Sequence, residues 1–108
     1  MLAAASSPSG ELDRATLKGA QAGDRAAQAE FVRCYQARVA AAVARMLPAA
    51  AHEVEAVAQE AFIKALRALP RFDPDGSARL SSWLITIAVR TALDPRRSAA
   101  RPRPARLP

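Results

Sequence analysis

The chain has little glycine, few aromatic residues, a single cysteine and no long apolar run. Its 108 residues include four glycines, one tryptophan, one tyrosine and three phenylalanines. Strands favour β-branched and aromatic residues, whereas Ala, Leu and Arg favour helices, so the composition between Glu11 and Asp94 predicts an all-α fold. A chain of this length is enough for one domain with a modest core.

The scarcity of cysteine and of apolar segments also indicates in which cellular compartment the protein is expected. Cys34 is the only cysteine, so it cannot form an internal disulfide, and this fits a reducing compartment. Residues 1–10 lack the basic start and apolar run of a signal peptide, and the sequence contains no stretch of membrane-spanning length. We therefore expect a cytoplasmic protein.

Patterns that many enzymes need are missing as well. The sequence has no glycine-rich phosphate loop, no internal repeat and no Cys and His residues at metal-ligand spacing. The one histidine, His52, has no nucleophile or carboxylate arranged with it, which favours a surface role over catalysis. We expect a binding protein without cofactor or metal, and not an enzyme.

Positive charge is concentrated in the last third of the chain. Residues 1–69 contain eight Lys and Arg against seven Asp and Glu, whereas residues 70–108 contain eight Arg against three Asp. Arg side chains match phosphate groups, so this end favours a nucleic-acid partner. Arg also accumulates in proteins from GC-rich genomes that bind no nucleic acid, and charge alone leaves that alternative open.

Apolar periodicity, caps and breakers predict four helices. Apolar residues recur at three- and four-residue steps in stretches that end at Gly or Pro. The predicted helices cover residues 10–22, 25–47, 53–69 and the stretch from Ser77 to the residue before Pro95, with N-caps at Ser9, Asp24 and Ser77. The segment 71–76 is expected to be an exposed loop.

The two ends of the chain are expected to be disordered. Residues 1–9 are short and rich in Ala and Ser, and residues 95–108 contain five Arg, four Pro and no acidic residue. Such segments cannot bury enough apolar surface to become ordered. The predicted organisation is a disordered N-terminus over 1–9, a helical domain over 10–94 and a basic tail over 95–108.

One face of the third predicted helix lies beside the core stripe. Ala56, Gln59, Glu60 and Ile63 follow one another at i, i+3, i+4 and i+7. Periodicity alone favours a solvated flank. The other interpretation is a docking surface, on which Gln59 and Glu60 supply specificity and Ile63 supplies buried area.

The fourth predicted helix has an outer face that suits phosphates or base edges, and the loop before it could surround an unstacked base. Solvated Arg and Ser are equally ordinary on such a face. Trp83 lies among apolar residues, which favours the core over a stacking role. The candidate DNA-binding residues are Arg71, Phe72, Asp75 and Gly76 in the loop and Arg79, Ser82, Thr86 and Arg90 on the helix.

Six blocks of sequence are informative when they are taken together. They are Ala22-Gly23-Asp24, Phe31-Val32-Arg33-Cys34-Tyr35, Gln59-Glu60-Ala61-Phe62-Ile63-Lys64-Ala65, Leu69-Pro70-Arg71-Phe72, Ser82-Trp83-Leu84-Ile85-Thr86-Ile87-Ala88 and Ala92-Leu93-Asp94. In their order and spacing, over about residues 11–97, they resemble region 2 of sigma factors of the extracytoplasmic-function (ECF) type.

The resemblance implies a compact four-helix domain with two partners. Its third helix would dock on the β′ clamp helices of core RNA polymerase through the positions of Ala56, Gln59, Glu60 and Ile63. Its fourth helix and the loop before it would bind the non-template strand of the minus-ten promoter element and hold a flipped base, which supports promoter melting in transcription initiation. An anti-sigma factor is a further partner that the family implies.

Three positions depart from the family pattern. Ala56 stands where the family usually has Asp, Gln28 where an aromatic is common, and Arg90 where Asn is frequent. No pattern resembling region 4 follows Pro95, so we expect a lone domain, an excised piece or a truncated paralogue. The alternatives are a protein-interaction module that occupies polymerase or an anti-sigma factor without initiating transcription, and a degenerate fragment.

Overall fold

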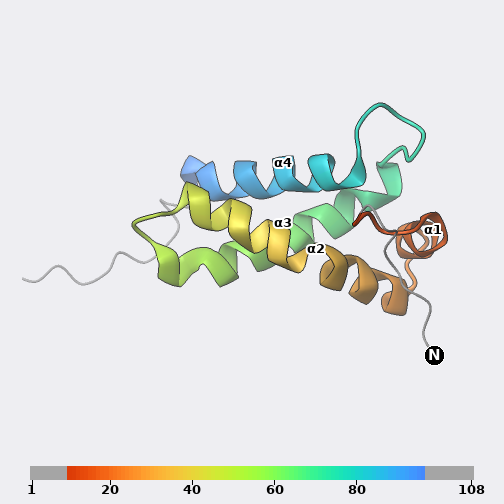
Figure 1. The fold of residues 1–108 in the computed structure, drawn as a ribbon, viewed down its shortest axis with the longest axis horizontal. Helices are drawn as coiled ribbons and strands as arrows, with labels where there is room; N and C mark the ends of the chain where they lie inside the picture. Colours follow the sequence, from red (N-terminus) through yellow and green to blue (C-terminus); the bar gives the residue numbers. More distant parts are fainter. Residues whose placement is uncertain (1–9, 97–108) are drawn as a thin grey trace, which may run out of the picture.

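The computed structural model describes residues 10–96. The predicted N-terminal tail over 1–9 lies outside the described residues, as do residues 97–108 of the predicted basic tail over 95–108, whose first two residues, Pro95 and Arg96, are helical. Four α-helices and two short 3₁₀ turns make up the described part, which contains no β-strand (Figure 1). The all-α, four-helix prediction is therefore confirmed. The elements are α1 (Arg14–Gln21), α2 (Arg25–Met46), η1 (Ala51–Glu53), α3 (Val54–Ala68), η2 (Leu69–Arg71) and α4 (Leu80–Leu93).

The first helix begins later than the sequence predicted, so the assignment of Ser9 as its cap was wrong. Asp13 is the N-cap of α1, and its Oδ1 accepts a hydrogen bond of 2.7 Å from the Thr16 amide. The chain before it is kept out of the helix by a tertiary contact, because the Leu12 amide donates to the Tyr35 hydroxyl at 2.9 Å.

The turn between α1 and α2 matches the prediction. Gly23 has a φ of +95°, a backbone conformation that favours glycine, and it ends the first helical segment. Asp24 is the N-cap of α2 and accepts from the Ala26 amide at 2.9 Å. Because the turn is this short, α1 packs directly against α2.

The start of α4 also differs from the prediction. Ser77 does not cap the helix, which begins at Leu80 with Arg79 at the N-cap position and no side-chain cap from that residue. The amide of Ser81 instead donates to Oε1 of Glu11 at 3.3 Å, an acceptor 70 positions away in sequence. The helix ends at Leu93, just before Pro95, as predicted.

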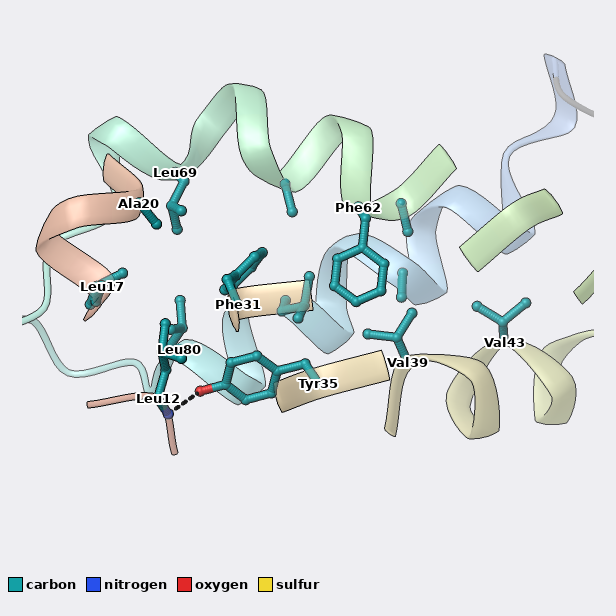
Figure 2. Close-up of a cluster of buried hydrophobic side chains, with 14 of the residues drawn as sticks. Leu12, Leu17, Ala20, Phe31, Tyr35, Val39, Val43, Phe62, Leu69 and Leu80 are labelled. Atoms are coloured by element: carbon teal, nitrogen blue, oxygen red, sulfur yellow. Dashed lines mark hydrogen bonds between the residues drawn. The ribbon is translucent and has the colours of Figure 1, made fainter. Parts of the chain in front are cut away.

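Aromatic residues from α2 and α3 occupy the middle of the core (Figure 2). The Phe31 ring makes edge contacts with Tyr35 and Phe62, at centroid separations of 5.6 and 5.9 Å. Val57 of α3 is buried, because α3 packs against both α2 and α4.

The ends of the bundle are unlike each other. Figure 1 shows α1 and the loop between η2 and α4 at one end, and the link between α2 and α3 at the other. No helix within residues 10–96 is both long enough and apolar enough to cross a bilayer.

Candidate functional site

The loop over residues 72–79, which we call the recognition loop, adjoins the outer face of α4. The eight candidate residues at the end of η2, in this loop and on α4 are called the recognition surface: Arg71, Phe72, Asp75, Gly76, Arg79, Ser82, Thr86 and Arg90. All except Phe72 are exposed. Ser82, Thr86 and Arg90 lie four residues apart on α4, and the Thr86 hydroxyl donates to the Ser82 carbonyl oxygen at 2.9 Å. Cationic and hydroxyl groups thus share one accessible face.

Phe72 differs from its neighbours because it packs inward. Its ring lies 5.2 Å from the ring of Trp83, at an interplanar angle of 51°. Both side chains are partly buried against the core. Trp83 therefore contributes to packing, as its apolar neighbours indicated, and it also supports the base of the loop.

The tip of the loop is a turn organised by Asp73. Its carbonyl oxygen accepts from the Gly76 amide at 3.1 Å, and its Oδ1 accepts from the Asp75 amide at 2.9 Å. A Cβ on Gly76 would lie 3.3 Å from the Asp73 carbonyl oxygen, which is tight. Asp75 also forms an ion pair with Arg14 of α1.

A pocket of about 220 Å³ separates this loop from α1. Phe72, Pro74 and Arg79 line it from the loop side, and Arg14 and Leu17 line it from α1. Apolar walls beside two guanidinium groups suit an unstacked base next to its phosphate. Phe72 and Arg79 of the predicted DNA-binding residues line this pocket, whereas Arg71, Asp75 and Gly76 do not. One wall of the pocket comes from α1, which the sequence did not indicate.

The face of α3 that was predicted to dock is accessible. Ala56 and Gln59 are exposed, and Ile63, 52% exposed, is one of two large apolar residues within 10–96 that are exposed, the other being Leu93. Glu60 is half-buried, and its Oε2 lies 3.3 Å from Nζ of Lys64. We call these four candidate residues, Ala56, Gln59, Glu60 and Ile63, the docking face.

A groove of about 480 Å³ between α2 and α3 borders the docking face at Gln59. Val32 and Ala40 line it from α2, and Val54 and Ala58 line it from α3. These apolar residues are only partly buried by the bundle. The groove extends the accessible apolar area beyond Ile63.

Two further residues near the recognition surface were not singled out from the sequence. Glu11 contacts the start of α4, and Gln21 contacts the residues that precede the loop. Gln28, one of the departures from the family pattern, donates from its amide to the Ala20 carbonyl oxygen at 3.3 Å. Gln28 thus makes a polar contact between α1 and α2.

Within residues 10–96, no cluster of three or more His, Cys, Asp or Glu could hold a metal ion.

Comparisons with known proteins agree on one family. The family model described as Sigma-70 region 2 matches residues 31–102. The ECF RNA polymerase sigma-E factor of Escherichia coli (strain K12) is 42% identical over 80 residues, which are 74% of this chain and 40% of that protein. The RNA polymerase sigma-H factor of Pseudomonas aeruginosa is 39% identical over 82 residues, which are 76% of this chain and 41% of that protein.

A solved structure shares the fold. It is the NMR structure of the complex formed by an engineered region 2 of sigmaE with GTAAAA, with a TM-score of 0.64 and 44% identity. The match covers 72% of this chain and 78% of that chain. The chain spans about two fifths of the length of the curated relatives it matches. It belongs to the sigma-70 region 2 family, as a region 2 domain of the ECF sigma-factor type.

Proposed function

We propose that this domain binds core RNA polymerase and the minus-ten promoter element, and thereby supports promoter melting. Membership of the family indicates a role as a transcription initiation factor that performs no bond chemistry. One observation carries the finer proposal: a pocket with apolar and cationic walls adjoins the exposed Arg, Ser and Thr face of α4. The related region 2 of sigmaE was solved in complex with GTAAAA.

Binding energy can open DNA without catalysis. A surface that binds an unstacked, single-stranded segment better than the duplex shifts the equilibrium toward the open form by that difference in affinity. In this proposal Arg79 and Arg90 contact phosphates, Ser82 and Thr86 hydrogen-bond to sugar or base edges, and the pocket receives one base. A few phosphate contacts give weak and salt-dependent binding, so the domain acts together with polymerase.

The docking face supplies the second half of the proposal. Ile63 offers apolar area that the bundle leaves exposed, flanked by Gln59 and Glu60. These residues lie on α3, whereas the DNA-binding face lies on α4, so one domain can contact both partners. We propose that the docking face binds the β′ clamp helices. Because both proposed partners are cytoplasmic, we propose that the domain acts in the cytoplasm.

The interaction-module alternative, which occupies polymerase or an anti-sigma factor without initiating transcription, is not favoured. The matched relatives are sigma factors, and the solved relative is in complex with GTAAAA.

Substitutions on the two faces test the proposal. Arg79→Ala is expected to weaken capture of a GTAAAA oligonucleotide by the polymerase-bound domain and to reduce the salt slope by about 0.7. Gln59→Ala and Glu60→Ala are expected to weaken polymerase binding without loss of helicity. Arg45→Ala, an exposed position near the end of α2, is the charge-matched control. Equal effects of Arg79→Ala and Arg45→Ala would contradict the DNA assignment.

A further inference from the structure

The start of α4 depends on a residue that is remote in sequence. Arg79 at the N-cap position makes no side-chain cap, yet the first amides of a helix need acceptors. Oε1 of Glu11 accepts from the Ser81 amide at 3.3 Å and from the Tyr35 hydroxyl at 3.1 Å. A carboxylate at this end also complements the helix dipole. Glu11 therefore caps α4 from outside and connects it to α2.

The other end of the loop is tied by Gln21, the last residue of α1. Its Nε2 donates to the Leu69 carbonyl oxygen at 2.9 Å and to the Phe72 carbonyl oxygen at 2.8 Å. These carbonyls lie in η2 and at the first residue of the loop. One half-buried side-chain amide thus donates to two backbone carbonyl oxygens at the junction between η2 and the loop.

Between these ties the loop has few other contacts. Residues 73–79 are exposed, and the contact from α1 to the tip is the Arg14–Asp75 ion pair, whose side chains are also mostly exposed. An exposed pair of this kind adds little to the rigidity of a loop. The position of the recognition loop is therefore set mainly at its two ends, by Glu11 and Gln21.

We propose that the segment over residues 10–21 positions the recognition loop and the start of α4, with Glu11 and Gln21 as positioning residues for DNA capture. The inference rests on the proposed function and deepens it, because it assigns the alignment of the pocket to a part of the chain outside the matched family range of 31–102. Neither residue is among the eight of the recognition surface, but Glu11 also lines the pocket, so loop exchange and Trp83 fluorescence, rather than capture alone, report on its positioning role. Each acts through backbone groups of the loop or of α4.

Three variants separate positioning from simple stabilisation. Glu11→Ala removes the cap, whereas Glu11→Gln keeps an acceptor oxygen. Gln21→Glu is nearly isosteric, but it turns an acceptor toward two carbonyl oxygens and loses both bonds. Val43→Ala is the control, because Val43 is fully buried and lies at the far end of the core from Leu12 and Leu80 (Figure 2).

Two kinds of measurement are made on the full chain. The first is fluorescence of Trp83, the sole tryptophan, which packs on Phe72 at the base of the loop, together with amide hydrogen exchange over residues 72–79. The second is capture of a GTAAAA oligonucleotide by the polymerase-bound domain, with polymerase affinity measured separately.

We expect Glu11→Ala and Gln21→Glu to shift Trp83 emission to longer wavelength, to speed exchange in the loop, and to weaken capture about tenfold with polymerase affinity unchanged. Glu11→Gln restores most of the capture, and Val43→Ala leaves loop exchange and capture near wild type. The proposal is overturned if Glu11→Ala and Gln21→Glu change the loop no more than Val43→Ala does. If the wild-type chain captures no DNA, the proposed function fails, while fluorescence and exchange still decide whether these residues position the loop.

Discussion

The rings of Phe72 and Trp83 lie 5.2 Å apart, at the junction where the recognition loop meets α4. Phe72 is the first residue of the loop, and Trp83 lies in the first turn of α4. Their contact therefore joins the start of the loop to the helix that follows the loop. Both rings pack against the core and are partly exposed. The aromatic pair thus adds a packing contact to the hydrogen bonds that Gln21 and Glu11 make at the two ends of the loop.

Phe72→Ala is expected to lower the free energy of unfolding by about 2 kcal/mol, less than for a fully buried phenylalanine because this residue is partly exposed. Urea unfolding measures the loss, and Trp83 emission moves to longer wavelength as the ring becomes wetter. Phe72→Leu, which keeps apolar volume, serves as the control. Unchanged emission in Phe72→Ala would show that the aromatic contact is absent in solution.

Tyr35→Phe is expected to destabilise the domain by about 1 to 3 kcal/mol, although it removes a single oxygen. That hydroxyl accepts from the Leu12 amide at 2.9 Å and donates to Glu11, so its loss leaves a buried amide without its acceptor. Burial of the phenol also raises the pKa of Tyr35, so the group stays neutral across the working range. Urea unfolding at neutral pH measures the change, and a loss below about half a kcal/mol contradicts the role of the bond.

The pH dependence of stability should report on Glu11. Burial opposes ionisation of this carboxyl, but hydrogen bonds from Ser81 and Tyr35 and the charge of Arg38 outweigh it and lower its pKa below the ordinary value of 4.5. A lowered pKa in the folded state gives stability that is complete above the unfolded-state value and is lost as the pH falls through the folded-state value. We expect the free energy of unfolding to drop between about pH 5 and pH 3.

Glu11→Gln should make this acid loss shallower. It does not abolish the loss, because the hydrogen bond from Thr16 lowers the pKa of Asp13 and acts in the same direction. Urea unfolding of both proteins at several pH values is the measurement. Parallel profiles for the wild type and Glu11→Gln would contradict the assigned environment of Glu11.

Gly23→Ala tests the turn between α1 and α2. A Cβ at Gly23 meets no atom within 4 Å, so any cost comes from the φ of +95° alone. The expected loss is about 1 to 2 kcal/mol, with Gly23→Asn less affected because Asn tolerates this conformation better. Thermal unfolding of the two variants measures the difference. Equal melting temperatures for Gly23→Ala and the wild type would show that the turn adopts another conformation.

The helices could be predicted from the sequence because their information is local. Apolar spacing and the breakers Gly23, Pro70 and Pro95 fixed the number and approximate extent of the helices, and the outer face of α4 is exposed as its periodicity indicated. The caps at Ser9 and Ser77 failed for a different reason. The starts of α1 and α4 depend on where Tyr35 and Glu11 lie after folding, which no local pattern contains.

The same limit applies to the candidate site. The exposure of the candidate residues on α3 and α4 follows from helical periodicity, whereas their assignment to a docking face and a recognition surface came from the family resemblance. Arg14 and Leu17 of α1 form one wall of the pocket. This wall could not be predicted from local sequence, because it depends on how α1 packs in the folded domain. Gln21 resembled an ordinary surface residue, because the two carbonyl oxygens to which its side chain donates belong to residues about 50 positions away in sequence.

Polymerase-dependent DNA capture tests the central claim most directly. The purified chain is titrated into a fluorescent single-stranded GTAAAA oligonucleotide, with and without core RNA polymerase, at two salt concentrations, and against a scrambled oligonucleotide. The account predicts capture that requires both polymerase and the domain, prefers GTAAAA and weakens with salt. Polymerase binding with no preference between the two oligonucleotides would contradict it.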